Sequence, residues 1–165
     1  MKSCENDQYL GAFPEQSNGA DYKSVTLPAK VQILYSPKLE KLELPETAFK
    51  NIFDLAGVSN IILDKDKKIF EIVFFEYPLI EIFLHKKFTT VIFHGESWTE
   101  LKITSSKFSN GKNSKKIDTI EKINYIPRFR IMNEKIMFCG KGAVTGDWIN
   151  IVFSNLLLYG FYGAE

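Results

Sequence analysis

One segment of the chain spaces its apolar residues as an α-helix does. Four of them recur at i, i+3, i+4 and i+7, the positions of one helical face: Phe49, Ile52, Phe53 and Ala56. Pro45 suits the first turn of a helix, and Gly57 suits the position just past its end. The pattern therefore predicts one helix over residues 45–56.

Elsewhere the apolar residues form short runs that turn residues separate. Such runs are typical of strands, and a turn signal every ~8–12 residues is typical of a sandwich. We expect strands at 24–27, 31–35, 60–63, 69–77, 80–85, 89–94, 98–104, 129–132, 135–139, 148–153 and 156–162. This predicts a mainly β (α+β) fold, either an antiparallel β-sandwich or a curved meander sheet, with one α-helix packed on it.

Three pairs of these runs are expected to form hairpins. The first surrounds the charged tip 64–68, the second surrounds Lys86-Lys87, and the third turns at Asn133-Glu134. Past Glu71, the run 69–77 is apolar at every position up to Phe75, which favours a strand buried on both faces.

The chain divides into a polar part and an apolar part. Residues 1–23 are polar and show no periodicity, which predicts an N-terminal tail or arm, and residues 24–165 are expected to form a single β-rich domain. Residues 105–116 are basic and contain Gly and Asn, which predicts a loop. Residues 117–126 carry Ile at every third position and fit a short helix or an irregular strand, of which we favour the strand.

The whole chain is nearly neutral, but its charged residues are unevenly distributed along the sequence. The net charge is +1, so long-range attraction of the whole molecule to nucleic acid or to an anionic membrane is not indicated. Residues 101–130 hold eight basic residues against two acidic ones, a net +6, whereas residues 1–21 hold a net −3. The segment 101–130 is therefore where we expect an acidic partner to bind.

The two cysteines, Cys4 and Cys139, are too few for a secreted disulfide framework. We expect free thiols in a reducing compartment, with a Cys4–Cys139 bridge left as an alternative. The N-terminus lacks a signal-peptide pattern, and no apolar run reaches the ~18–20 residues of a membrane span, so we expect a cytoplasmic protein.

Each residue or segment that could serve in metal binding, catalysis or phosphate binding also has a simpler structural interpretation. His85 and His94, in the arms of one expected hairpin, could bind a metal with Glu96, but no metal-ligand spacing supports this. Cys139 lies in an apolar run that favours an inert thiol over a nucleophile. The glycine-rich segment 140–146 lacks the G-K-[ST] ending of a phosphate-binding loop. We expect no metal and no cofactor.

The absence of catalytic motifs favours a non-enzymatic protein-binding domain. The best expectation is a small bacterial inhibitor, such as an immunity protein that neutralises a toxin by occluding its active site. The partner protein is expected to be acidic, with no membrane partner and nucleic acid disfavoured. The expected contact residues are Lys107, Phe108, Lys112, Lys115, Lys116 and Arg128. An enzyme with a site around His85 and His94 and a nucleic-acid-binding or phage structural module remain as alternatives.

Overall fold

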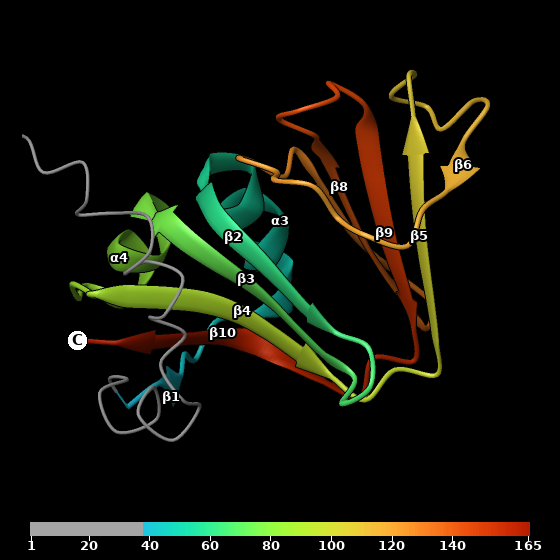
Figure 1. Ribbon diagram of the computed structural model, residues 1–165. Helices are drawn as coiled ribbons and strands as arrows, with labels where there is room; N and C mark the ends of the chain where they lie inside the picture. The colour runs from blue at the N-terminus through green and yellow to red at the C-terminus, as the bar shows by residue number, and fades with distance from the viewer. Residues whose placement is uncertain (1–37) are drawn as a thin grey trace, which may run out of the picture. The chain divides into compact units, whose positions relative to one another are not determined.

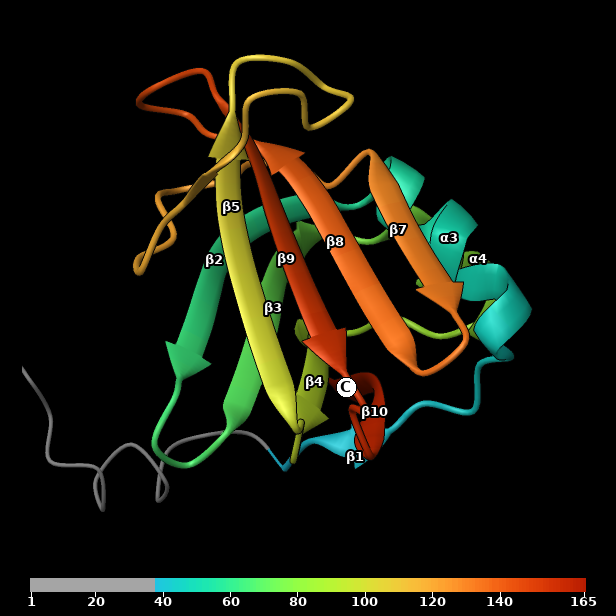
Figure 2. The same cartoon turned by 90° about the vertical axis from the view of Figure 1, so that its right-hand side faces the viewer.

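Two five-stranded antiparallel sheets face each other in the computed structural model, which describes residues 38–165 (Figures 1 and 2). Sheet A has the order β1 (Glu40–Lys41), β10 (Leu158–Ala164), β4 (Thr90–Glu96), β3 (Ile69–Glu76), β2 (Gly57–Asp64). Sheet B has the order β6 (Lys115–Lys116), β5 (Glu100–Ser106), β9 (Trp148–Ser154), β8 (Lys135–Lys141), β7 (Arg128–Met132). The expected mainly β, α+β fold is confirmed.

The expected helix and two of the expected hairpins are present. Helix α3 spans Glu46–Leu55. Strands β2 and β3 pair around the charged tip, and β7 and β8 pair around Asn133, which takes the left-handed φ of 53° that a two-residue hairpin turn requires. The arm at 1–23, the strands at 24–27 and 31–35 and Cys4 lie outside the described residues.

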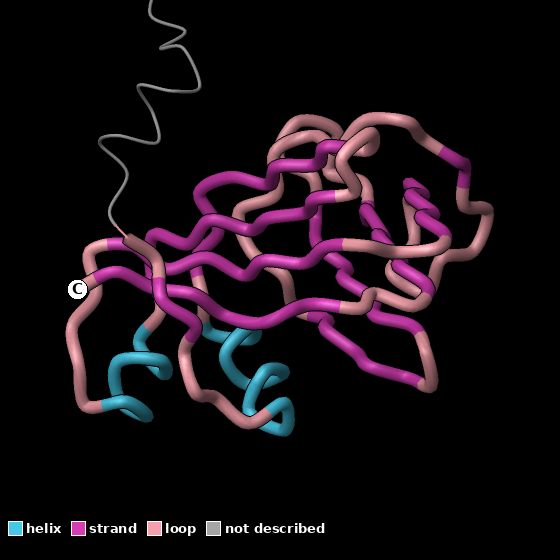
Figure 3. Tube along the Cα trace, turned by 90° about the horizontal axis from the view of Figure 1, so that it is seen from below, coloured by secondary structure: helices cyan, strands magenta, loops and turns pink. Residues whose placement is uncertain are grey.

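The expected strand at 80–85 is instead a second helix, α4 (Pro78–Leu84), so the hairpin predicted around Lys86-Lys87 is wrong. Pro78 occupies the first helical turn, and His85 ends the helix with a left-handed φ of 52°. Strand β4 pairs with β3 and β10. Figure 3 shows α3 and α4 on the same side of the strands.

Burial of β3 on both faces is also a wrong prediction. Phe70, Ile72 and Phe74 are buried between the sheets, but Phe75 on the other face is 58% exposed. Within residues 38–165, sheet B covers one face of sheet A and no described layer packs against the outward face of β3.

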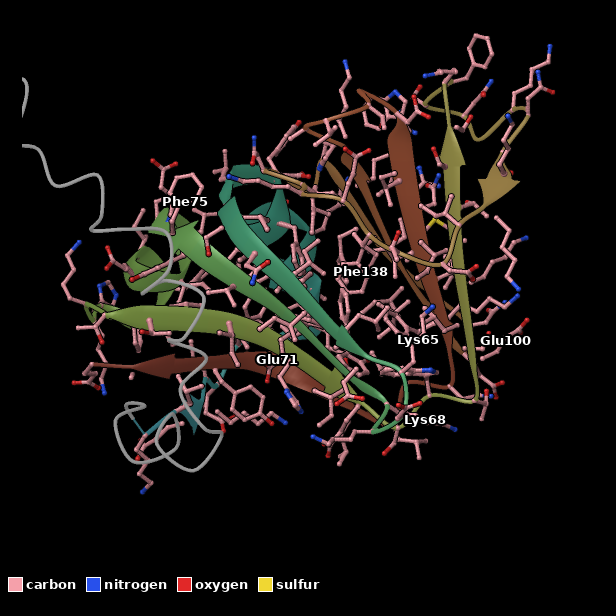
Figure 4. The ribbon with its side chains drawn as sticks, viewed as in Figure 1. Lys65, Lys68, Glu71, Phe75, Glu100 and Phe138 are labelled. Atoms are coloured by element: carbon pink, nitrogen blue, oxygen red, sulfur yellow. The ribbon has the colours of Figure 1, made fainter. Side chains whose placement is uncertain are left out.

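Phenylalanine side chains from α3 and from both sheets form the core. Phe53 of α3 stacks on Phe129 of sheet B, with ring centroids 4.6 Å apart, and its ring lies 5.4 Å from that of Phe93 of sheet A. Phe138 of β8 points into the space between the sheets (Figure 4) and lies 5.2 Å from Phe70 of β3. Helix α3 is thus an integral part of the core.

The segment 117–126 is neither a helix nor a regular strand. Isolated bridges join it to both sheets, from Tyr125 to Gly57 of β2 and from Ile123 to Gly142, the residue after β8. Ile123 and Ile126 are buried. The loop expected at 105–116 is shorter than predicted, because its first two residues belong to β5 and its last two form β6.

Candidate binding surface

The outer face of sheet B is strongly basic. Side chains alternate between the two faces of a strand, and directly paired residues share a face. Because Ile103, Phe138 and Ile151 point into the core, their strand neighbours point outward. The outward residues include six cations and one carboxylate, that of Glu100: Lys102, Lys116, Arg128, Arg130, Lys135 and Lys141.

The centre of this outer face is less polar than its rim. Met137, Trp148 and Val152 point outward and are half-buried. The strand pairing places Arg128 and Lys116 at the two ends of one row across the sheet, which also contains Cys139, Asn150 and Thr104. A face with an apolar centre and a charged rim has the composition of a protein–protein contact.

Two loops leave sheet B at one end, which we call the loop end: residues 107–114 after β5 and residues 142–147 before β9. Lys107 Nζ lies 2.6 Å from Asp147 Oδ1, and Ser105 Oγ donates to Asp147 Oδ2 at 2.8 Å. The hydrogen bond from Lys107, followed by that from Ser105, lowers the pKa of Asp147. These contacts join the two loops.

The loop 107–114 is held by its own hydrogen bonds. Ser106 Oγ donates to the carbonyl oxygen of Lys112 at 2.7 Å and accepts from the backbone N–H of Phe108 at 3.1 Å. The N–H of Gly111 donates to the carbonyl oxygen of Phe108 at 3.0 Å. The Phe108 side chain is nevertheless 52% exposed. The loop therefore presents an aromatic ring from a fixed backbone.

Arg128 joins this loop to the face of sheet B. One guanidinium nitrogen donates to the carbonyl oxygen of Ser109 at 2.5 Å, and the guanidinium carbon lies 5.4 Å from the ring centroid of Trp148. This is a cation–π arrangement. All six residues that we expected to contact a partner lie at this end of sheet B, in the loop 107–114, in β6 and at the start of β7.

Sequence reasoning missed most of the basic face. Lys102, Arg130, Lys135 and Lys141 were not among the expected contact residues, and neither was the half-buried Trp148. Along each strand these residues alternate with apolar residues, and this pattern could have predicted which side chains face outward. The pairing of β5 with β9, about fifty residues later in the chain, was not visible in the sequence.

Cys139 is a free, buried thiol, as expected. It points to the outer face of sheet B, opposite Arg128 on β7 and Asn150 on β9. Burial raises the pKa of the thiol, against a smaller opposing effect of Arg128. A raised pKa disfavours the thiolate, so the residue lacks the activation that a nucleophilic cysteine needs.

The two histidines have different surroundings, so their expected pairing across a hairpin is wrong. His85 ends α4, whereas His94 lies on the outer face of sheet A. There His94 Nδ1 lies 3.0 Å from Glu71 Oε1 and Nε2 lies 3.4 Å from Glu96 Oε2. Among residues 38–165, no three His, Cys, Asp or Glu side chains are placed to hold a metal ion.

The cluster of His94 with two glutamates predicts a pH dependence of stability. The hydrogen bond to Glu71 is the largest cause that raises the pKa of His94 above 6.5. A raised folded-state pKa gives stability that is fully present below the unfolded pKa and is lost as pH rises through the folded pKa. The urea midpoint of the wild type should therefore fall toward that of His94→Gln between about pH 5.5 and 8.5. A constant difference between the two midpoints across this range would contradict the assignment.

The glycine-rich segment 140–146 is held by a carboxylate. The backbone N–H groups of Val144 and Thr145 donate to Glu121 Oε2 at 2.8 and 3.0 Å, and the Thr145 hydroxyl also contacts this carboxylate. These bonds, led by that of the hydroxyl, lower the pKa of Glu121. The N–H groups that a phosphate would need are already in use.

The comparisons with known proteins are negative: no family model, no curated protein and no solved structure matches this chain. Neither helix in the described part of the chain has the length and apolar character needed to cross a membrane.

Proposed function

We propose that this chain is a non-enzymatic protein-binding domain that holds an acidic partner protein against the outer face of sheet B. The observation that carries the proposal is the concentration of six cations with one carboxylate on a single sheet face, in a chain whose net charge is only +1. Complementary charge of this kind accelerates association and selects the partner.

The character of the face favours a protein over a nucleic acid. Met137 and Val152 give its centre an apolar character that suits side chains rather than phosphates. On this face the ring on which a base of single-stranded nucleic acid would stack is that of Trp148, and the guanidinium of Arg128 already lies over it.

An inhibitor that occludes the active site of a toxin remains the specific role that we propose for such a domain. Occlusion needs a rigid, complementary surface and no catalytic group of its own. The regular pairing of β5, β9, β8 and β7 supplies the rigidity, and the basic rim supplies a means of recognising an acidic site.

Charge reversal on the face tests this proposal. The triple variant Lys102→Glu, Arg130→Glu, Lys135→Glu should weaken capture of the partner by about tenfold or more, since opposite charges at a contact become like charges. All three residues are exposed, so the melting temperature should change little. Capture is measured with immobilised chain, and the bound proteins are quantified by mass spectrometry.

The matched control makes the same charge change elsewhere, at exposed lysines in the chain before β1, in α3 and in the β2–β3 turn: Lys38→Glu, Lys50→Glu and Lys67→Glu. Equal capture by the two triple variants would contradict the proposal. Capture that disappears on treatment with nuclease would instead support the nucleic-acid alternative.

A further inference from the structure

Two exposed apolar side chains stand at the tips of the loop end. Phe108 in the loop 107–114 is 52% exposed, and Val144 in the loop 142–147 is 83% exposed. Neither takes part in the face of sheet B proposed above, because each lies beyond the last paired residue of its strand.

The two tips belong to one end of the molecule. Ser106 and Lys141, which precede the two loops, both pair with Trp148. Strands β5 and β8 therefore flank β9, and the bases of the loops lie about 10 Å apart, twice the spacing of neighbouring strands. Both loops project from the same end of sheet B in Figures 1 and 2.

Unneutralised cations surround these tips. Lys112, Lys115, Lys141 and Arg128 lie in the loops or at the strand ends beside them. Within residues 38–165, none of these four forms an ion pair. The two acidic residues nearby are already bonded, Asp147 to Lys107 and Glu121 to the loop 142–147.

We propose that the loop end docks on an anionic lipid bilayer, with Phe108 and Val144 entering the interface and the four cations meeting acidic headgroups. Apolar tips ringed by lysine and arginine suit a surface that is anionic outside and apolar within. A protein pocket for two separate tips would need two matched cavities, whereas a bilayer accepts both tips without shape complementarity.

The charge near the loop end, more than the net charge of the chain, determines how strongly an anionic bilayer attracts this part of the molecule. A net charge of +1 led us to expect no membrane partner, but electrostatic attraction falls off within a Debye length of about 8 Å at physiological salt. The four cations at the loop end lie in one small region, and each Lys or Arg near an anionic surface contributes roughly a fivefold gain in affinity.

The loops need little rearrangement to bind in this way. The hydrogen bonds of Ser106 and the ion pair between Lys107 and Asp147 already fix the loop 107–114, and Glu121 fixes the loop 142–147. A preformed contact loses less conformational entropy on binding than a flexible one.

Sedimentation of the full chain with lipid vesicles tests the proposal. The chain should bind phosphatidylcholine vesicles that contain about 30 mol% phosphatidylserine, and binding should fall with added salt. Phe108→Ser should weaken this binding by about tenfold, since a phenylalanine side chain no longer enters the interface. The double variant Lys112→Glu, Lys115→Glu should weaken it at least as much, and binding to pure phosphatidylcholine should be weak throughout.

Two control variants match these changes at other sites. Leu157, which is 72% exposed in the turn at the opposite end of sheet B, becomes serine, and Lys38 and Lys67 become glutamate. Both controls should bind vesicles as the wild type does. Thermal unfolding of every variant shows that the fold is intact.

Three results would overturn the proposal. The first is a wild-type chain that stays in the supernatant with phosphatidylserine vesicles. The second is an equal loss of binding in Phe108→Ser and Leu157→Ser. The third is vesicle binding that Phe108→Ser leaves unchanged while it abolishes capture of a protein partner, which would assign the tips to a protein contact. None of these results bears on the triple variant of the sheet face, so the two proposals stand or fall separately.

Discussion

Replacing Phe53 with alanine should lower the free energy of unfolding by about 3–5 kcal/mol, the usual range for removing a buried phenylalanine ring. The side chain is 0% exposed. Its ring contacts aromatic rings of both sheets, so the cavity would open where α3, sheet A and sheet B meet, with ring centroids within 4.6–5.7 Å: Phe74, Phe93, Phe129, Phe138 and Phe161. Few neighbours can move into such a cavity without losing their own contacts.

Urea unfolding monitored by circular dichroism measures this effect. Phe108→Ala is the matched control, because it removes the same ring from a half-exposed site and should change stability by less than about 0.5 kcal/mol. A similar decrease in the free energy of unfolding in Phe53→Ala and Phe108→Ala would contradict the central packing role of Phe53.

Gly140→Ala should destabilise the fold by about 1–3 kcal/mol, the usual cost of overpacking a core. A Cβ atom at this position would collide with the Ile123 side chain and lie 2.9 Å from the carbonyl oxygen of Tyr125. Both belong to the segment 117–126, whose backbone is held by bridges to β2 and to Gly142. The segment would have to move away from β8 and expose Ile123 and Ile126.

Gly57→Ala provides the comparison for this effect. The three atoms nearest to a Cβ atom there all belong to the ring of Phe75, which is 58% exposed and can swing into solvent. The same substitution should therefore destabilise much less at Gly57 than at Gly140 in parallel urea titrations. The reverse order would contradict the packing described for the segment 117–126.

The two binding proposals are compatible in space. The strands of sheet B run away from the loop end, and Glu100 lies at the far end of β5 (Figure 4). A bilayer that contacts the loop tips, Arg128 and Lys141 would leave the rest of the outer face of sheet B open, with Lys102, Arg130 and Lys135 on it. A partner protein could then be held next to the membrane surface.

Local features of the sequence determined much of the secondary structure. The spacing of Phe49, Ile52 and Phe53 was sufficient for α3, and turn residues between apolar runs were sufficient for the β2–β3 and β7–β8 hairpins. These elements form between neighbours in the chain, so their signals lie within ten to twenty residues. The basic character of 101–130 was also visible as composition.

The tertiary structure decided everything that depends on distant pairing. The apolar run after Pro78 predicted a strand, but the structure has helix α4 there, with Ile80 packed in the core. In the part of the chain that the structure describes, no third layer covers the outer face of β3, and Phe75 is exposed there. His94 lies beside Glu71 because β3 pairs with β4 in one particular register.

The candidate binding surface also depends partly on the local sequence and partly on the tertiary structure. The sequence by itself predicted a basic loop over residues 105–116, of which residues 107–114 are a loop in the structure, and it showed that Arg128 lies near this loop in the chain. Only the pairing of β6, β5, β9, β8 and β7 placed six cations on one face, stacked Arg128 on Trp148 and brought Val144 to the same end as Phe108. Charge and periodicity are properties of short segments, whereas a surface depends on which strands become neighbours, and long-range packing determines that choice.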